Sequence, residues 1–146
     1  MDSTGGLPER ITDVVLARRE ILEAYLFGSR ARGAGQAHSD IDIAVFIDES
    51  QIKPGPFGYR SDLTATLMSA LRTNSVDVVI LNHAPPLLYH RVLRDGLRLL
   101  SRDLRATTVR EGRALSRYCD FVPHLAKVDA ILSVSRRITT RYHGAG

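Results

Sequence analysis

Two aspartates, Asp40 and Asp42, flank the start of the clearest apolar run in this 146-residue chain. The run Ile41–Ile47 is rich in β-branched residues, which favours a strand. Side chains two positions apart on a strand point to the same face, so both carboxylates project together. Two neighbouring acids repel each other and raise each other's pKa. A hard divalent cation such as Mg²⁺ relieves that repulsion and prefers oxygen ligands of this kind.

A third acid, Asp77, stands near the start of a second apolar run at residues 76–81 and is the only ionisable residue in it. Neighbouring strands lie about 4.8 Å apart, so Asp77 can face Asp40 and Asp42 if the two runs pair in one sheet. We expect Asp77 either to help hold a metal or to accept a proton from an attacking hydroxyl. Carboxylates that share metals in this way form a two-metal site.

The dipeptide Gly28-Ser29 ends another short apolar run at residues 22–27. Glycine lets a backbone approach a phosphate closely, and a helix that begins there offers free N–H groups. The Ser29 hydroxyl can donate to a phosphate oxygen, and Arg30 adds positive charge. Ten residues separate Ser29 from Asp40. Gly-Ser and Asp-x-Asp at one fixed distance arise by chance on the order of 10⁻⁵ times per start position, so the pattern predicts a site.

Gly-Ser, ten residues and Asp-x-Asp resemble the signature of the polymerase-β-like nucleotidyltransferase superfamily. Residues 26–33 and 39–46 are similar to its minimal nucleotidyltransferase branch, and so are residues 76–81, 84–88 and 92–96. The resemblance covers about residues 22–101 well and the C-terminal helices more loosely. It implies an α/β (α+β) fold in which a short mixed β-sheet is flanked by helices.

The resemblance also implies roles for individual residues. Gly28 and Ser29 would hold the triphosphate of ATP. Asp40, Asp42 and Asp77 would hold magnesium, and the same three carboxylates would be the catalytic residues. Arg30 and Ser39 are further candidates for contact with the nucleotide. Every position of the signature is kept in this chain, so the motif predicts an active enzyme.

Many members of this branch are MntA-type antitoxins of type VII toxin–antitoxin systems, each paired with a HEPN-type (HepT-like) RNase toxin. The resemblance implies a protein adenylyltransferase that transfers AMP from ATP to a tyrosine hydroxyl of the toxin within a hetero-oligomer. One alternative is an enzyme that modifies a small molecule or an RNA end. It is disfavoured because 146 residues leave no separate substrate domain. The other alternative is a non-catalytic antitoxin that acts by binding, and the intact acids disfavour it.

Composition predicts one globular domain over residues 1–146, with a core at about 9–102 and C-terminal helices at about 103–142. A single cysteine excludes an intrachain disulfide. No apolar stretch approaches the roughly 18 residues that span a bilayer, and we expect a cytoplasmic protein without membrane contact. The net charge is +4, but the arginines are spread along the chain, so we expect no direct binding to nucleic acid.

The hydrophobic pattern predicts alternating helices and strands around the motif. Asp103 is the expected N-cap of a helix that ends near residue 118, and Pro123 is expected to begin a separate last helix. We expect arginines of that last helix to help dock a partner; they are Arg136, Arg137 and Arg141. The remaining expected elements are helices at 9–21, 60–73 and 85–95 and strands at 22–27, 41–47, 76–81 and 97–100.

Overall fold

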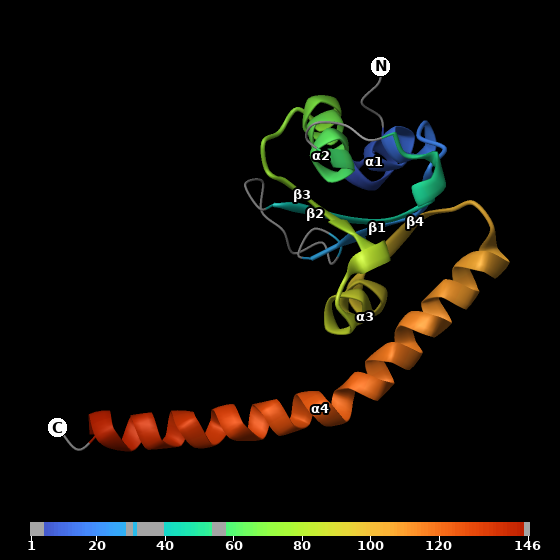
Figure 1. The fold of residues 1–146 in the computed structure, drawn as a ribbon. Coiled ribbons are helices and arrows are strands. Elements are labelled where there is room, and N and C mark those ends of the chain that lie inside the picture. Colours follow the sequence, from blue (N-terminus) through green and yellow to red (C-terminus); the bar gives the residue numbers. More distant parts are fainter. Residues whose placement is uncertain (1–4, 29–30, 32–39, 54–57, 145–146) are drawn as a thin grey trace.

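A four-stranded mixed sheet forms the centre of the molecule in the order β3-β2-β1-β4 (Figure 1). The computed structural model describes residues 5–28, 31, 40–53 and 58–144, and for 125, 126 and 128–144 it describes the backbone alone. The short mixed sheet predicted from the sequence is therefore confirmed. Its strands are β1 (Ile21–Phe27), β2 (Ile41–Ile47), β3 (Val76–Ile80) and β4 (Leu97–Ser101).

One face of the sheet is covered by α1 (Leu7–Leu16) and α2 (Gly58–Leu71). Every second residue of β2, from Ile41 to Ile47, is buried in this layer. This is the alternation that the sequence predicts, with the aspartates on the opposite face. The first helix ends five residues earlier than expected, because Ile21 already belongs to β1.

The other face packs against α3 (Pro86–Asp95) and the first part of α4 (Leu104–Gly144). Tyr89 and Val92 of α3 and Ala114 of α4 belong to the second hydrophobic cluster, which includes Phe27 and Ala44 of the sheet. The β2 residues on the same face as Asp42, such as Ala44, therefore face α3 and α4. Gly96 ends α3 as predicted, because its amide donates to the carbonyl of Val92.

The topology brings three separate stretches of chain to one edge of the sheet. Strands β2 and β3 are parallel, so both begin at this edge. Strand β1 is antiparallel to β2, so β1 ends there. We call this place the acid edge and define it by Gly28, Asp40, Asp42 and Asp77.

The C-terminal helix α4 is continuous over 41 residues, and Pro123 lies inside it. The prediction of two helices is wrong here. An internal proline removes one helical hydrogen bond and favours a kink, but the turns on either side can continue. The predicted N-cap is confirmed, because Oδ1 of Asp103 accepts from the amides of Arg105 and Ala106 at 3.1 and 3.2 Å.

Figure 1 shows that the second half of α4 runs away from the sheet and its covering helices. That half includes the stretch expected to dock a partner, and its side chains lie outside the described part of the chain. No helix within the described ranges combines the length and the apolar composition needed to cross a membrane.

Candidate active site

Asp42 lies at the centre of the acid edge, between residues of two neighbouring strands. Its Cα partner on β1 is Phe27, the last residue before Gly28, and its partner on β3 is Asp77. The strand pairing expected from the sequence is confirmed. Asp40 is exposed and directly precedes β2. Three motifs spread over fifty residues of sequence therefore lie at the same end of three adjacent strands, with Asp42 on the middle strand.

Gly28 takes a backbone conformation that side chains rarely adopt, with φ at +77°. A Cβ atom built on Gly28 would collide with the Oδ2 atom of Asp42. The position therefore requires glycine for two reasons, its dihedral angle and the space that the carboxylate takes up. The sequence had indicated close backbone approach at this glycine, and the structure places the Asp42 carboxylate in that space.

The electrostatics of the acid edge leave Asp42 under repulsion. Its pKa is raised mainly by burial, and next by the negative charges of Asp77 and Asp40. In the described part of the chain, Asp42 has no hydrogen bond or ion pair that would offset this. The mutual repulsion expected from the sequence thus contributes to the raised pKa of Asp42, and desolvation contributes more.

Arg60 is a residue of the site that sequence reasoning missed. It stands in the first turns of α2, and its guanidinium donates to Oδ1 of Asp77 at 3.2 Å and to the carbonyl of Val78 at 2.7 Å. Both charged side chains are more than half exposed. In the sequence Arg60 is one of many arginines of the chain, and nothing in its local pattern connects it to Asp77.

Not every predicted site residue can be placed. Ser29, Arg30 and Ser39 lie outside the described residues. Among those that are described, no three histidine, cysteine, aspartate or glutamate side chains converge closely enough to hold a metal ion. Arg60 engages Asp77 from its far side.

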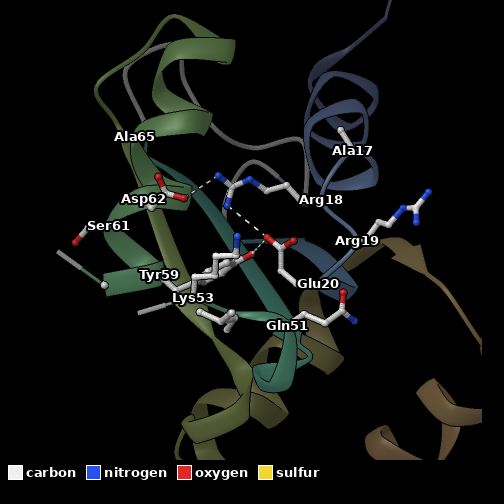
Figure 2. Close-up of a pocket in the computed structure, with 12 residues that line it drawn as sticks. Ala17, Arg18, Arg19, Glu20, Gln51, Lys53, Tyr59, Ser61, Asp62 and Ala65 are labelled. Atoms are coloured by element: carbon white, nitrogen blue, oxygen red, sulfur yellow. Dashed lines mark hydrogen bonds and ion pairs between the residues drawn. The ribbon is translucent and has the colours of Figure 1, made fainter. Parts of the chain in front are cut away.

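A cavity lies elsewhere, at the opposite end of the sheet. It has a volume of about 700 Å³ and is lined by residues just before β1, just after β2 and at the start of α2. Figure 2 shows Arg18 turned toward Asp62 and Glu20, while Arg19 points away from them. Arg18 contacts Asp62 at 2.9 Å and Glu20 at 3.5 Å, and Tyr59 donates to Glu20 at 2.8 Å. These groups neutralise each other, so the chemistry of the chain points to the acid edge instead.

The fold and the acid edge define a nucleotidyltransferase domain. The sequence model of the family described as "Polymerase beta, Nucleotidyltransferase" matches residues 9–105, about two thirds of the chain. This protein therefore belongs to the polymerase β nucleotidyltransferase family. The matched region contains all the residues of the acid edge.

One curated relative is similar to part of this chain. The protein adenylyltransferase MntA of Aphanizomenon flos-aquae (strain 2012/KM1/D3) is 37% identical over 78 residues, which are 49% of this chain and 51% of the relative. The chain thus spans about half the length of this curated relative.

Two solved structures resemble the chain over most of its length. A chain in the crystal structure of a toxin–antitoxin with AMP-PNP is 26% identical. The likeness covers 87% of this chain and 99% of that one, with a TM-score of 0.71. A chain in a crystal structure of an MntA–HpeT toxin–antitoxin mutant is also 26% identical, with a TM-score of 0.69. This second likeness covers 88% of this chain and 99% of that one.

Proposed function

We propose that this protein is the antitoxin of a type VII toxin–antitoxin system and acts as a protein adenylyltransferase. It transfers AMP from ATP to a tyrosine hydroxyl of a HEPN-type RNase toxin and releases pyrophosphate. The partner and the acceptor rest on the sequence resemblance. They are supported by the likeness to an adenylyltransferase and to a toxin–antitoxin chain with AMP-PNP.

One observation carries the proposal. Asp42 and Asp77 lie opposite each other in register at one sheet edge, with Gly28 close against the Asp42 carboxylate. The pKa of Asp42 is raised by burial first and then by the nearby charges of Asp77 and Asp40, while Asp77 is paired with Arg60. Perturbed carboxylates in such a cluster are typical of catalytic sites.

The donor set of the acid edge fits magnesium. Only oxygen ligands are offered, by Asp40, Asp42 and Asp77, and a cation would remove the repulsion that raises the pKa of Asp42. When bound, Mg²⁺ would neutralise charge on the phosphate oxygens of ATP and so stabilise the transition state. We assign the holding of the metal to Asp40 and Asp42, with Asp77 as the third carboxylate of the site.

The residues of the chain then have separate tasks. Gly28 lets the backbone come close to the phosphates, and Ser29, with Arg30 and Ser39, would contact the nucleotide. The tyrosine oxygen attacks the α-phosphorus, and the bond from that phosphorus to the bridging oxygen breaks. Pyrophosphate leaves with the bonding electron pair. We assign the tyrosine proton to Asp77, which is half exposed and open to an incoming acceptor.

Arg60 is added to this assignment as a positioning residue. Its two hydrogen bonds, one to Asp77 and one to the backbone of β3, fix the side of the carboxylate that faces α2. The other carboxylate oxygen remains for the reaction. Arg60→Gln should therefore lower transfer while leaving the fold intact, because the guanidinium is largely exposed.

The test is transfer of AMP to the toxin, followed by intact-mass spectrometry of the co-expressed pair. Asp77→Asn should reduce transfer by about 10²–10⁴-fold, the usual contribution of a general base. Asp40→Asn/Asp42→Asn should abolish it. Asp13→Asn is the matched control, since Asp13 is an exposed acid on α1.

Two outcomes would contradict the proposal. Transfer by Asp77→Asn above about a tenth of the wild-type rate would remove Asp77 as the base. An unmodified toxin that is fully neutralised by the Asp40→Asn/Asp42→Asn variant would overturn the enzymatic mechanism. Neutralisation by binding alone would then replace it.

A further inference from the structure

A second polar cavity lies on the α3/α4 face of the sheet, away from the acid edge. Its volume is about 440 Å³, and one wall is Phe46, about 13 Å along β2 from Asp42 at the rise of a strand. The opposite wall is α4. We call this cavity the arginine pocket; the residues that define it are Phe46, Asn82, Tyr89, Arg110, Arg113 and Arg117.

The pocket has more positive than negative charge. Its three arginines follow each other at three- and four-residue intervals, which places them on one side of α4. Arg110 is neutralised by the buried Glu23. Arg113 and Arg117 have no ion pair or hydrogen bond within the described part of the chain. Two guanidinium groups are therefore free to bind an anion.

Aromatic rings hold two of the guanidinium groups in place. The Arg110 guanidinium lies over the ring of Phe46, with 4.9 Å to the ring centroid, and that of Arg117 lies over Tyr89 at 6.0 Å. Such stacking orients the planar group and reduces the entropy lost when it binds an anion. The larger cavity at the other end of the sheet differs, because Arg18 there is already paired with acids.

Tyr89 adds a donor that the fold does not use. The residue is 2% exposed, and its hydroxyl has no hydrogen-bond partner among the described residues. Buried hydroxyls are nearly always hydrogen-bonded, so this donor is available to an acceptor that enters the pocket; Oε1 of the neighbouring Glu23 is likewise without a partner among the described residues. Burial raises the pKa of Tyr89 to about 12, so the hydroxyl keeps its proton at neutral pH.

We propose that the arginine pocket binds a small phosphorylated molecule at a site separate from the acid edge. Guanidinium groups match the oxygens of a phosphate and can bind them in pairs. The cavity volume lies within the range of small-molecule sites. This inference is independent of the adenylyltransferase proposal, because the acid edge contributes no residue to the pocket.

The test is isothermal titration of the purified chain with inorganic pyrophosphate and with AMP, both in EDTA. Without divalent cations the acid edge binds anions less well, and the part of the binding that depends on Arg113 and Arg117 reports the arginine pocket. Wild type should bind both probes. Arg113→Gln/Arg117→Gln should weaken binding at least tenfold for each charged hydrogen bond removed. Arg105→Gln is the control, since Arg105 is an exposed α4 arginine that does not line the pocket.

Further variants make the result decisive. Asp42→Asn should bind pyrophosphate in EDTA as well as wild type, which separates this site from the acid edge. Unchanged affinity in Arg113→Gln/Arg117→Gln, with a native circular dichroism spectrum, would overturn the proposal. So would the absence of binding to wild type at millimolar probe. Tighter binding of a short single-stranded RNA than of AMP through the same arginines would also overturn it.

Discussion

Two carboxylates on adjacent strands of the same sheet are treated in opposite ways. Glu23 of β1 is fully buried, and its Oε2 atom accepts from Arg110 at 2.6 Å and from Thr107 at 2.9 Å. Asp42 of β2 is partly exposed, and its closest charged neighbours are acids that raise its pKa. Within the described residues, the fold pairs the first carboxylate with a cation and gives the second none.

This difference separates a structural charge from the charge that we propose is functional. A buried carboxylate without a partner strongly destabilises the fold, so Glu23 requires the arginine that α4 supplies. The pair joins α4 to the sheet. The charge of Asp42 destabilises the fold less because water still reaches this side chain. No group of the described chain offsets this destabilisation at the acid edge. A cation from outside the chain would remove it.

The largest change in stability should come from removing Arg110, the cation that is paired with Glu23. Arg110→Ala leaves a buried, uncompensated carboxylate and should lower the free energy of unfolding by about 3–5 kcal/mol. Chemical denaturation measures it. Arg113→Ala, three residues along α4 and exposed, should stay within about 0.5 kcal/mol of wild type.

A double variant sharpens the interpretation of the Glu23–Arg110 pair. Glu23→Leu/Arg110→Leu removes both charges and should recover most of the stability that Arg110→Ala loses. A loss below about 1 kcal/mol for Arg110→Ala would show that Glu23 is not held by this pair in solution, and the contrast with Asp42 would fail.

The next effect concerns the glycine that makes room for Asp42. Gly28→Ala puts a side chain at a positive φ, which destabilises the fold by about 1–2 kcal/mol. The added Cβ atom also collides with the Asp42 carboxylate. Gly58→Ala is the control: its φ is +81°, but no atom lies within 4 Å of an added Cβ. Gly28→Ala should therefore destabilise more than Gly58→Ala in a denaturant titration.

The same pair of variants can contradict the geometry of the acid edge. The excess destabilisation of Gly28→Ala should shrink when Asp42 is also replaced by alanine, because the colliding carboxylate is gone. Equal losses for the two glycine variants would show that Asp42 does not lie against Gly28.

Much of the acid edge could be predicted from the sequence because its signals are local. Alternation in Ile41–Ile47 places both aspartates of the motif on one face, and the structure confirms the face and the strand bounds. The sequence placed Asp77 beside Asp42 on the condition that the two apolar runs pair, and the structure shows that they do. Glycine at position 28 could be recognised because few other residues permit such close approach.

The remaining features depend on contacts between distant parts of the chain. Arg60 reaches Asp77 across 17 positions, and Arg110 reaches Glu23 across 87, and no periodic pattern encodes either contact. The continuity of α4 through Pro123 was missed for another reason. Proline is a strong local signal for a helix end, but here it stands inside the helix.

A smaller effect should follow at the unused hydroxyl beside α4. Tyr89→Phe removes a buried donor that has no partner in the described part of the chain. The unliganded protein should become more stable by roughly 1 kcal/mol, since the desolvation penalty of that hydroxyl disappears. Thermal denaturation with Tyr118→Phe as the control measures the gain, because Tyr118 is a half-buried residue on α4. A loss of stability would show that the hydroxyl is hydrogen-bonded in solution.

The smallest effect is expected at Asp42 itself, where the sign matters more than the size. Asp42→Asn should make the metal-free protein more stable at pH 7, measured in EDTA. The folded-state pKa of Asp42 is raised by burial and by Asp77 and Asp40, so ionisation weakens the fold. The stability of wild type relative to the variant is highest below the unfolded-state pKa, about 3.9, where Asp42 is protonated in both states. It falls as pH rises through the raised folded-state pKa.

The gain from Asp42→Asn should therefore grow from about pH 4 upward and level off once the carboxylate is fully ionised. Asp13→Asn, on an exposed face of α1, should show no such trend. Adding Mg²⁺ and ATP should reverse the order of stability, because the ligand stabilises wild type and loses a binding group in the variant. A variant less stable than wild type across this pH range in EDTA would mean that the Asp42 charge is already satisfied within the chain. The contrast with Glu23 would then be lost.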